Sequence, residues 1–114
     1  MNKPILCVDF DGVIHSYTSG WKGSATVSDP PVPGALRWLW KATEWFDVQI
    51  YSSRSKDTGG REAMWYWMAA HSADEFGHDH PMAACPMDGY PVKFGLMAQT
   101  PLRPGKAENE VPGT

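Results

Sequence analysis

Two short polar clusters in this sequence carry residues that can do chemistry. Asp9 and Asp11 stand at the end of an apolar run, separated by one residue, and Ser52-Ser53-Arg54 follow a second apolar run. Two neighbouring carboxylates can divide labour, because an ionised one attacks as a nucleophile while the other exchanges protons. They also attract Mg²⁺, which favours sites with one or two carboxylates plus phosphate oxygens. Hydroxyl and guanidinium groups bind phosphoryl oxygens, so the two clusters together indicate phosphate chemistry.

Each cluster also has a simpler interpretation that the residues leave open. The two aspartates suit a turn or a helix cap, and the serines suit ordinary turn chemistry. Arg54, in a polar stretch, can equally be a solvated surface residue. The choice depends on the elements that position these side chains.

Two predicted strands lead into the two clusters. Residues 4–10, PILCVDF, form a nearly continuous apolar run, typical of a strand buried on both faces of a parallel sheet. A helix is the alternative for this run, but the run is too short for one, and Cys7 is expected to be buried in the strand. Residues 48–51 are β-branched and aromatic and predict a second strand that ends in a polar loop.

Helical patterns follow each of these strands. Pro33-Gly34 opens residues 35–46, whose apolar side chains recur at helical spacing, and Gly59-Gly60 precede a second such pattern over 61–71. A strand, a helix and a strand in this order predict a right-handed parallel unit. Since ligands bind outside the carboxyl ends of parallel strands, both polar clusters are expected at one ligand-binding edge.

The segment between the first strand and the first helix, residues 12–32, is rich in Ser, Thr, Gly and Pro around isolated aromatic residues. We expect a short flap here, with residues 13–14 and 25–27 as candidate strands of a small hairpin. Trp21 is a candidate for shielding the site or selecting the substrate.

The last third of the chain gives weaker signals. Residues 90–98, YPVKFGLMA, are a candidate third strand despite Pro91 and Gly95. Residues 100–114 are expected to form a flexible tail. The predicted organisation is therefore a single domain over residues 1–99, followed by the tail.

Composition narrows the class of protein. A length of 114 residues and a mass of 12.6 kDa support one domain. With 42% hydrophobic and 20% charged residues the composition is globular, and no apolar run reaches the ~20 residues of a membrane span. A net charge of −3 gives no support for binding a nucleic-acid backbone. Two cysteines and an N-terminus without a signal peptide favour a reducing, cytoplasmic setting.

Two motifs resemble those of the haloacid dehalogenase superfamily. ILCVDFDGVIH resembles the superfamily's first motif, an apolar strand ending Asp-x-Asp-Gly-Val, and IYSSRS resembles its second, an apolar strand ending in Ser or Thr. The order of DFDGVIH, a Gly-rich flap, Pro-x-Pro-Gly and Ser-Ser-Arg is similar to small phage and bacterial members. The resemblance covers residues 4–71 and implies an α/β fold: a minimal Rossmann-like, three-layer parallel sheet with a short flap after the first strand.

The resemblance also implies a function, since most superfamily members are Mg²⁺-dependent phosphatases. Asp9 would be the nucleophile that forms an aspartyl-phosphate, and it would bind Mg²⁺ as well. Asp11 would be the general acid and base and would give the metal its backbone carbonyl. Gly12 would contribute to phosphate binding in the same loop.

The second motif would supply the remaining phosphate contacts. Ser52 is the better match to the superfamily's phosphate-binding hydroxyl, Ser53 is the alternative, and Arg54 would be a cation on the substrate side. The expected substrate is a phosphorylated small molecule or a nucleotide.

The sequence departs from the superfamily pattern at its third and fourth motifs. A lysine should neutralise charge beside the phosphate, and the candidates are Lys93, Arg103 and Lys106. An apolar strand ending in one or two acids should complete the metal site, and none follows. Glu108 and Glu110 lie in a segment without a hydrophobic run, which makes them poor metal ligands.

The missing fourth motif has a structural consequence. The strand that carries it normally lies beside the first strand, so without it residues 4–10 form an exposed apolar edge, and such edges pair with other strands. We expect a homodimer through this edge, a borrowed strand, or a truncated relative of an active enzyme. The alternatives to catalysis are a catalytically incomplete protein that binds metal or phosphate, and an interaction module that uses the edge.

Overall fold

The computed structural model describes residues 3–84, 87, 89–95, 108–109 and 111–112. Its main sheet has three parallel strands in the order β1-β2-β3. These strands are β1 (Ile5–Val8), β2 (Asp47–Ile50) and β3 (Lys93–Phe94). Two further strands, β4 (Glu108–Asn109) and β5 (Val111–Pro112), pair with each other in antiparallel orientation.

Each crossover between the parallel strands contains a helix. Helix α1 (Ala35–Ala42) lies between β1 and β2, and α2 (Gly60–Phe76) lies between β2 and β3. Short 3₁₀ turns, η1 (Ser53–Lys56) and η2 (Pro81–Ala83), precede and follow α2. The predicted α/β architecture with a parallel sheet and two helices is confirmed.

The register of the sheet aligns the strand ends that lead into the two polar clusters. Val8 lies opposite Ile50, and Ile50 lies opposite Phe94. Asp9 therefore leaves β1 at the same edge of the sheet at which residues 51–54 leave β2. This is the edge where the sequence places the candidate site.

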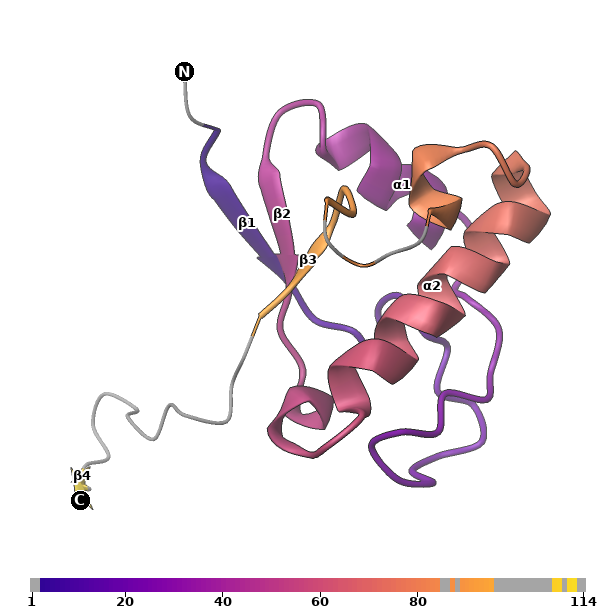
Figure 1. The fold of residues 1–114 in the computed structure, drawn as a ribbon. Coiled ribbons are helices and arrows are strands. Elements are labelled where there is room, and N and C mark those ends of the chain that lie inside the picture. Colours follow the sequence, from indigo (N-terminus) through magenta and orange to yellow (C-terminus); the bar gives the residue numbers. More distant parts are fainter. Residues whose placement is uncertain (1–2, 85–86, 88, 96–107, 110, 113–114) are drawn as a thin grey trace.

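Both helices cover the same face of the sheet (Figure 1). Val8, Val48 and Ile50 are buried in one apolar cluster with residues of α1 and α2, whereas Ile5 is 60% exposed and Cys7 is exposed. The expectation of a first strand buried on both faces is therefore wrong. In the described residues the spatial order of the parallel strands follows their order in the sequence. When successive crossovers have the same hand and the sheet grows in one direction, their helices lie on one face.

Helix α2 begins where the backbone of two segments is in close contact. Gly59 precedes the helix with φ of 83°, and Gly60, its first residue, is buried against η1. A Cβ at position 60 would lie 1.8 Å from the carbonyl oxygen of Arg54. The glycine is therefore required by space, and it fixes where α2 meets the loop after β2.

Gly60→Ala tests this close contact. Helix propensity alone favours alanine by about 1 kcal/mol, but the backbone oxygen of Arg54 has to move to make room for the new methyl group. We expect the clash to dominate and the free energy of unfolding to fall by about 1–3 kcal/mol, measured by urea denaturation. Glu62→Ala, an exposed change in the same helical turn, is the control, and equal stability of the two variants would contradict the prediction.

The flap over residues 12–32 contains isolated bridges in place of the expected hairpin. His15 pairs with Asp11 and with Pro31, and neither 13–14 nor 25–27 forms a strand. Ser16 N–H donates to the carbonyl of Pro30 at 3.0 Å, and Val32 N–H donates to that of Ile14 at 2.8 Å. These hydrogen bonds hold the two ends of the flap side by side. The residues between them make their tertiary contacts through side chains and single carbonyl groups.

The third strand is shorter than predicted. β3 includes two residues of the expected range 90–98, and residues 96–98 lie outside the described residues. Of the predicted tail, residues 100–107, 110 and 113–114 also lie outside them. No helix in the described part of the chain has the length and apolarity needed to cross a membrane.

Candidate active site

Asp9 is exposed at the carboxyl end of β1. Its Oδ1 accepts the backbone N–H of Phe10 at 2.8 Å. Within the described residues no cationic group contacts its carboxylate. Phe10 itself is fully buried and fixes the backbone beside the carboxylate. Asp9 is therefore an exposed side chain on a fixed backbone at the carboxyl edge of the sheet.

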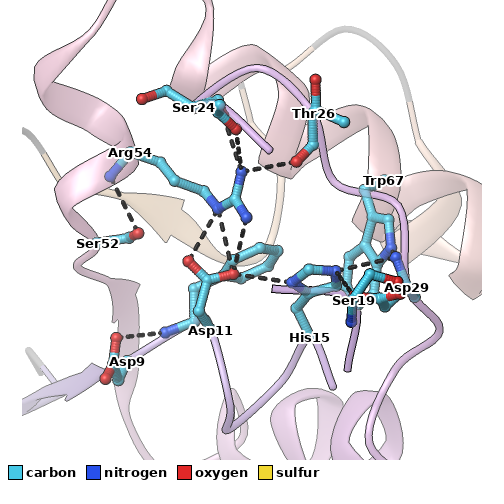
Figure 2. A network of polar contacts seen from close by, with 12 residues as sticks. Asp9, Asp11, His15, Ser19, Ser24, Thr26, Asp29, Ser52, Arg54 and Trp67 are labelled. Atoms are coloured by element: carbon cyan, nitrogen blue, oxygen red, sulfur yellow. Dashed lines mark hydrogen bonds and ion pairs between the residues drawn. The ribbon is translucent and has the colours of Figure 1, made fainter. Parts of the chain in front are cut away.

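Asp11 is held between a cation and an imidazole ring (Figure 2). Arg54 donates from Nε to Oδ2 at 2.9 Å and from a terminal nitrogen to Oδ1 at 3.0 Å. His15 Nδ1 lies 2.8 Å from Oδ1. The two aspartates therefore occupy different environments, since one carboxylate is free and the other is fixed.

Arg54 has a different place from the one the resemblance implies. Its side chain is fully buried, and its second terminal nitrogen donates to the carbonyls of Gly23, Ser24 and Thr26 at 2.9–3.0 Å. A buried arginine needs acceptors for its planar set of donors, and Asp11 and the flap supply them. Arg54 thus joins the flap to Asp11 through an internal ion pair, with its side chain buried.

A buried polar network that the sequence did not reveal surrounds His15. The backbone N–H of Asp29 donates to His15 Nε2 at 3.0 Å, so the ring proton lies on Nδ1 and points at Asp11. Trp67 of α2 donates from Nε1 to the carbonyl of Asp29 at 2.8 Å. The rings of His15 and Trp67 also meet edge to face at 5.4 Å. The network fastens the start of the flap to α2.

Asp29 is a charged member of this network. It is 5% exposed, and it accepts hydrogen bonds from both the hydroxyl and the backbone N–H of Ser19. These bonds stabilise the carboxylate and lower the pKa of Asp29 below its ordinary value, although burial acts in the opposite direction. The flap therefore contains an acid whose ionised form is favoured by its hydrogen bonds.

Ser19→Ala tests the contribution of Asp29 to stability. Because folding lowers this pKa, the stabilisation is present above about pH 4, where unfolded aspartates are ionised, and is lost as the pH falls through the folded-state pKa. We expect Ser19→Ala to be less stable than wild type in urea at neutral pH and the difference to shrink at about pH 3. The control is Ser16→Ala, because the Ser16 hydroxyl has no hydrogen-bond partner among the described residues. A difference that is independent of pH would refute the assignment.

The serines after β2 occupy distinct positions. Ser52 is buried, and its Oγ accepts the N–H of Arg54 at 3.2 Å, which caps η1. Ser53 is exposed. Turn chemistry is therefore present at Ser52, and this contact also orients its hydroxyl group at the carboxyl edge of the sheet. Gly12, with φ of 84°, donates its N–H to the carbonyl of His15 at 2.7 Å, so this N–H is already satisfied within the turn.

Lys93 lies opposite Gln49 on β2, and its side chain is directed towards the start of β2, away from the edge at which Asp9 leaves β1. It is 62% exposed, and its Nζ lies 2.9 Å from the carboxylate of Asp47, the first residue of β2. The hydrogen bond and the charge of Lys93 lower the pKa of Asp47, and Gln49 and Lys3 add smaller effects in the same direction. The structure therefore does not bring Lys93 to Asp9. Arg103 and Lys106 lie outside the described residues.

Two groups with oxygen atoms at this edge are of the type that binds hard cations, the carboxylate of Asp9 and the backbone carbonyl of Asp11. The described residues contain no group of three His, Cys, Asp or Glu side chains that can hold a metal ion. The carboxylate of Asp9 is free, and no N–H in the described part of the chain donates to the backbone carbonyl of Asp11. Carboxylate and carbonyl oxygens are ligand types that a hard cation takes together with water and phosphate oxygens. Of the two weak candidates, Glu108 lies in β4 and Glu110 is outside the described residues.

These features define a small α/β protein with a three-stranded parallel sheet and a pair of unlike carboxylates at its carboxyl edge. No protein-family model matches the sequence, and no match was found among curated proteins or solved structures. The functional argument therefore depends on the geometry of the site and on the motifs themselves.

Proposed function

We propose that this protein is a Mg²⁺-dependent phosphomonoesterase of the haloacid dehalogenase type. The observation that carries the proposal is the contrast between Asp9, exposed and free at the end of β1, and Asp11, fixed two residues later by Arg54 and His15. One carboxylate is free to attack, and the other is held in place to exchange a proton.

The proposed reaction has two steps that use these carboxylates. A carboxylate oxygen of Asp9 attacks phosphorus, the ester P–O bond breaks, and the alcohol leaves with the proton of Asp11, which enters this step as the carboxylic acid. Asp11 then takes a proton from water, which attacks phosphorus and breaks its bond to Asp9, so inorganic phosphate leaves, Asp9 is again a carboxylate and Asp11 is again protonated. Ser52 lies at the end of the adjacent strand, where its hydroxyl can bind a phosphoryl oxygen.

Mg²⁺ would be held by the carboxylate of Asp9 and the backbone carbonyl of Asp11. When bound, the ion would neutralise charge between the nucleophile and the phosphate. Because these two ligands leave most of the coordination shell to water and phosphate, we expect metal affinity to depend on the phosphorylated ligand. The substrate class is a phosphorylated small molecule or nucleotide with an accessible phosphate.

The test is release of inorganic phosphate from a generic aryl phosphate, with and without Mg²⁺. Turnover that requires Mg²⁺ and stops when EDTA is added supports the proposal. Absence of turnover across a panel of aryl phosphates and nucleotides, with the fold intact by circular dichroism, contradicts it.

A second candidate function is binding without catalysis. It is favoured by the lack of a third acid at the site among the described residues, and by β1, which pairs with β2 alone in that part of the chain. Ile5 on this strand is 60% exposed. The protein would then bind Mg²⁺ or phosphate without turnover, or use the β1 edge to pair with a second copy or another strand.

Calorimetry and light scattering separate these alternatives. Binding of Mg²⁺ or phosphate without turnover indicates a catalytically incomplete protein, and neither binding nor turnover indicates an interaction module. A dimer in which the β1 amides are protected from exchange supports pairing through the edge. A monomer whose β1 amides exchange freely contradicts it.

A further inference from the structure

A single guanidinium group connects the flap to the candidate acid–base residue. One side of Arg54, Nε and one terminal nitrogen, faces the carboxylate of Asp11, and the other terminal nitrogen faces flap carbonyls that include Ser24 and Thr26 (Figure 2). Because the group is planar and rigid, its two sides cannot be oriented independently. The position of the flap and that of Asp11 are therefore geometrically linked.

The burial of Arg54 strengthens this link. The guanidinium lies 5.9 Å from the ring centroid of Phe10, which is fully buried, and 4.9 Å from that of Trp21, which is 52% exposed. With the side chain at 0% exposure, water does not reach the donors while the flap is in place. If residues 23–26 moved away, three hydrogen bonds of one nitrogen would be lost together, and the guanidinium would lose its orientation.

The same contacts distinguish the two carboxylate oxygens of Asp11. Oδ1 accepts from His15 Nδ1 at 2.8 Å, from the terminal nitrogen of Arg54 at 3.0 Å and from its Nε at 3.2 Å. Oδ2 accepts from Arg54 Nε alone, at 2.9 Å, among the described residues. Oδ2 therefore accepts fewer hydrogen bonds than Oδ1, and the orientation of the carboxylate depends on Arg54 and His15 together.

We infer that Arg54 is a positioning residue that couples the flap to Asp11, so that the carboxylate of Asp11 keeps its orientation while residues 23–26 hold the guanidinium group. The coupling itself depends on the contacts described above. Its catalytic consequence rests on the proposed phosphatase function, and the two are tested by different measurements.

Amide hydrogen exchange in the flap tests the coupling without any substrate. Thr26 is the reporter, because its N–H donates to the carbonyl of Gly23 at 3.2 Å and its own carbonyl accepts from Arg54. Asp11→Asn replaces one acceptor oxygen by an NH₂ group, which cannot accept from the guanidinium. We expect this change to increase the exchange rate of Thr26 by about 10-fold.

Asp9→Asn is the matched control, since it makes the same chemical change at the same strand end without touching Arg54. It should leave the exchange of Thr26 within about 2-fold of wild type. Equal exchange of Thr26 in the Asp11→Asn and Asp9→Asn proteins would overturn the coupling. This comparison is decisive even if every substitution of Arg54 fails to fold.

Arg54→Lys completes a double-mutant cycle. Lysine keeps the charge, but its single nitrogen cannot hold the carboxylate and the flap carbonyls in one fixed plane. Thr26 should exchange faster in this variant, and adding Asp11→Asn should change its exchange by less than about 2-fold. An undiminished effect of Asp11→Asn in the Arg54→Lys protein would show that the coupling does not pass through Arg54.

The catalytic consequence is measured with aryl phosphate. We expect Arg54→Lys to lower kcat by about 100-fold, because Asp11 is misplaced, and to leave KM within about 3-fold, because Asp9 and Ser52 are not changed. A rise in KM with unchanged kcat would overturn the catalytic role of Arg54. If wild type shows no turnover while the exchange cycle gives the expected result, the proposed function fails and the coupling stands.

Discussion

Asp9→Asn is expected to abolish Mg²⁺-dependent phosphate release while leaving the fold intact. The amide cannot act as a nucleophile towards phosphorus and is a poor ligand for a hard cation, so we expect kcat to fall by at least ~10³-fold. Because Asp9 is exposed and makes its one hydrogen bond to the adjacent N–H, the thermal midpoint should stay close to that of wild type. Phosphate release and circular dichroism measured on the same sample test both parts of this prediction.

The matched control for this change is Asp74→Asn. Asp74 is an exposed residue of α2, so its substitution changes the net charge by the same amount away from the carboxyl edge of the sheet. It should keep the activity of wild type. An Asp9→Asn protein that is folded and retains activity would exclude Asp9 as the nucleophile.

Arg54→Met is expected to cause a large loss of stability. It leaves Asp11, which is 19% exposed, without its cation, and three flap carbonyls without their donor, around a side-chain position that is fully buried. Removing one partner of a buried ion pair costs about 3–5 kcal/mol, which is a large part of the ~5–15 kcal/mol that stabilises a typical domain. Urea denaturation at neutral pH measures the loss.

Arg37→Met provides the comparison. Arg37 is 68% exposed and lies 3.2 Å from Glu75, so it has the same type of ion pair in a solvated setting. Exposed pairs contribute about 0–1 kcal/mol. If Arg54→Met is no more destabilising than Arg37→Met, the contacts that Arg54 makes with Asp11 and the flap do not stabilise the fold, and the prediction is wrong.

The parallel unit could be predicted from the sequence because its signals are local. The apolar run that ends at Asp9 and the β-branched run that ends before Ser52 predict strands, and the helical spacing between them predicts the crossover. Since parallel strands share an edge, the meeting of these two segments follows as well. The burial of Cys7 was predicted wrongly, because the composition of a strand does not say how many of its faces are covered.

The contacts of Arg54 could not be predicted in the same way. Its partners are 28–43 residues away along the chain, and most of them are backbone carbonyls, which every residue type has. The surrounding sequence, Ser-Ser-Arg-Ser, is polar and is therefore typical of an exposed loop. The contact between Asp29 and Trp67 was not predicted for a similar reason. Trp67 donates to a backbone carbonyl in a distant segment, and no sequence motif links the two residues.

By itself, the sequence determined the class of fold and the order of the two carboxylates, because strand and helix periodicity and a two-residue spacing are local properties of the chain. The tertiary structure alone decided which of these groups is free and which is fixed. A charged side chain either stays available to a ligand or forms an ion pair inside the protein. Its surroundings decide which, and contacts between distant segments determine those surroundings. Asp9 remained open, and Asp11 and Arg54 took each other as partners.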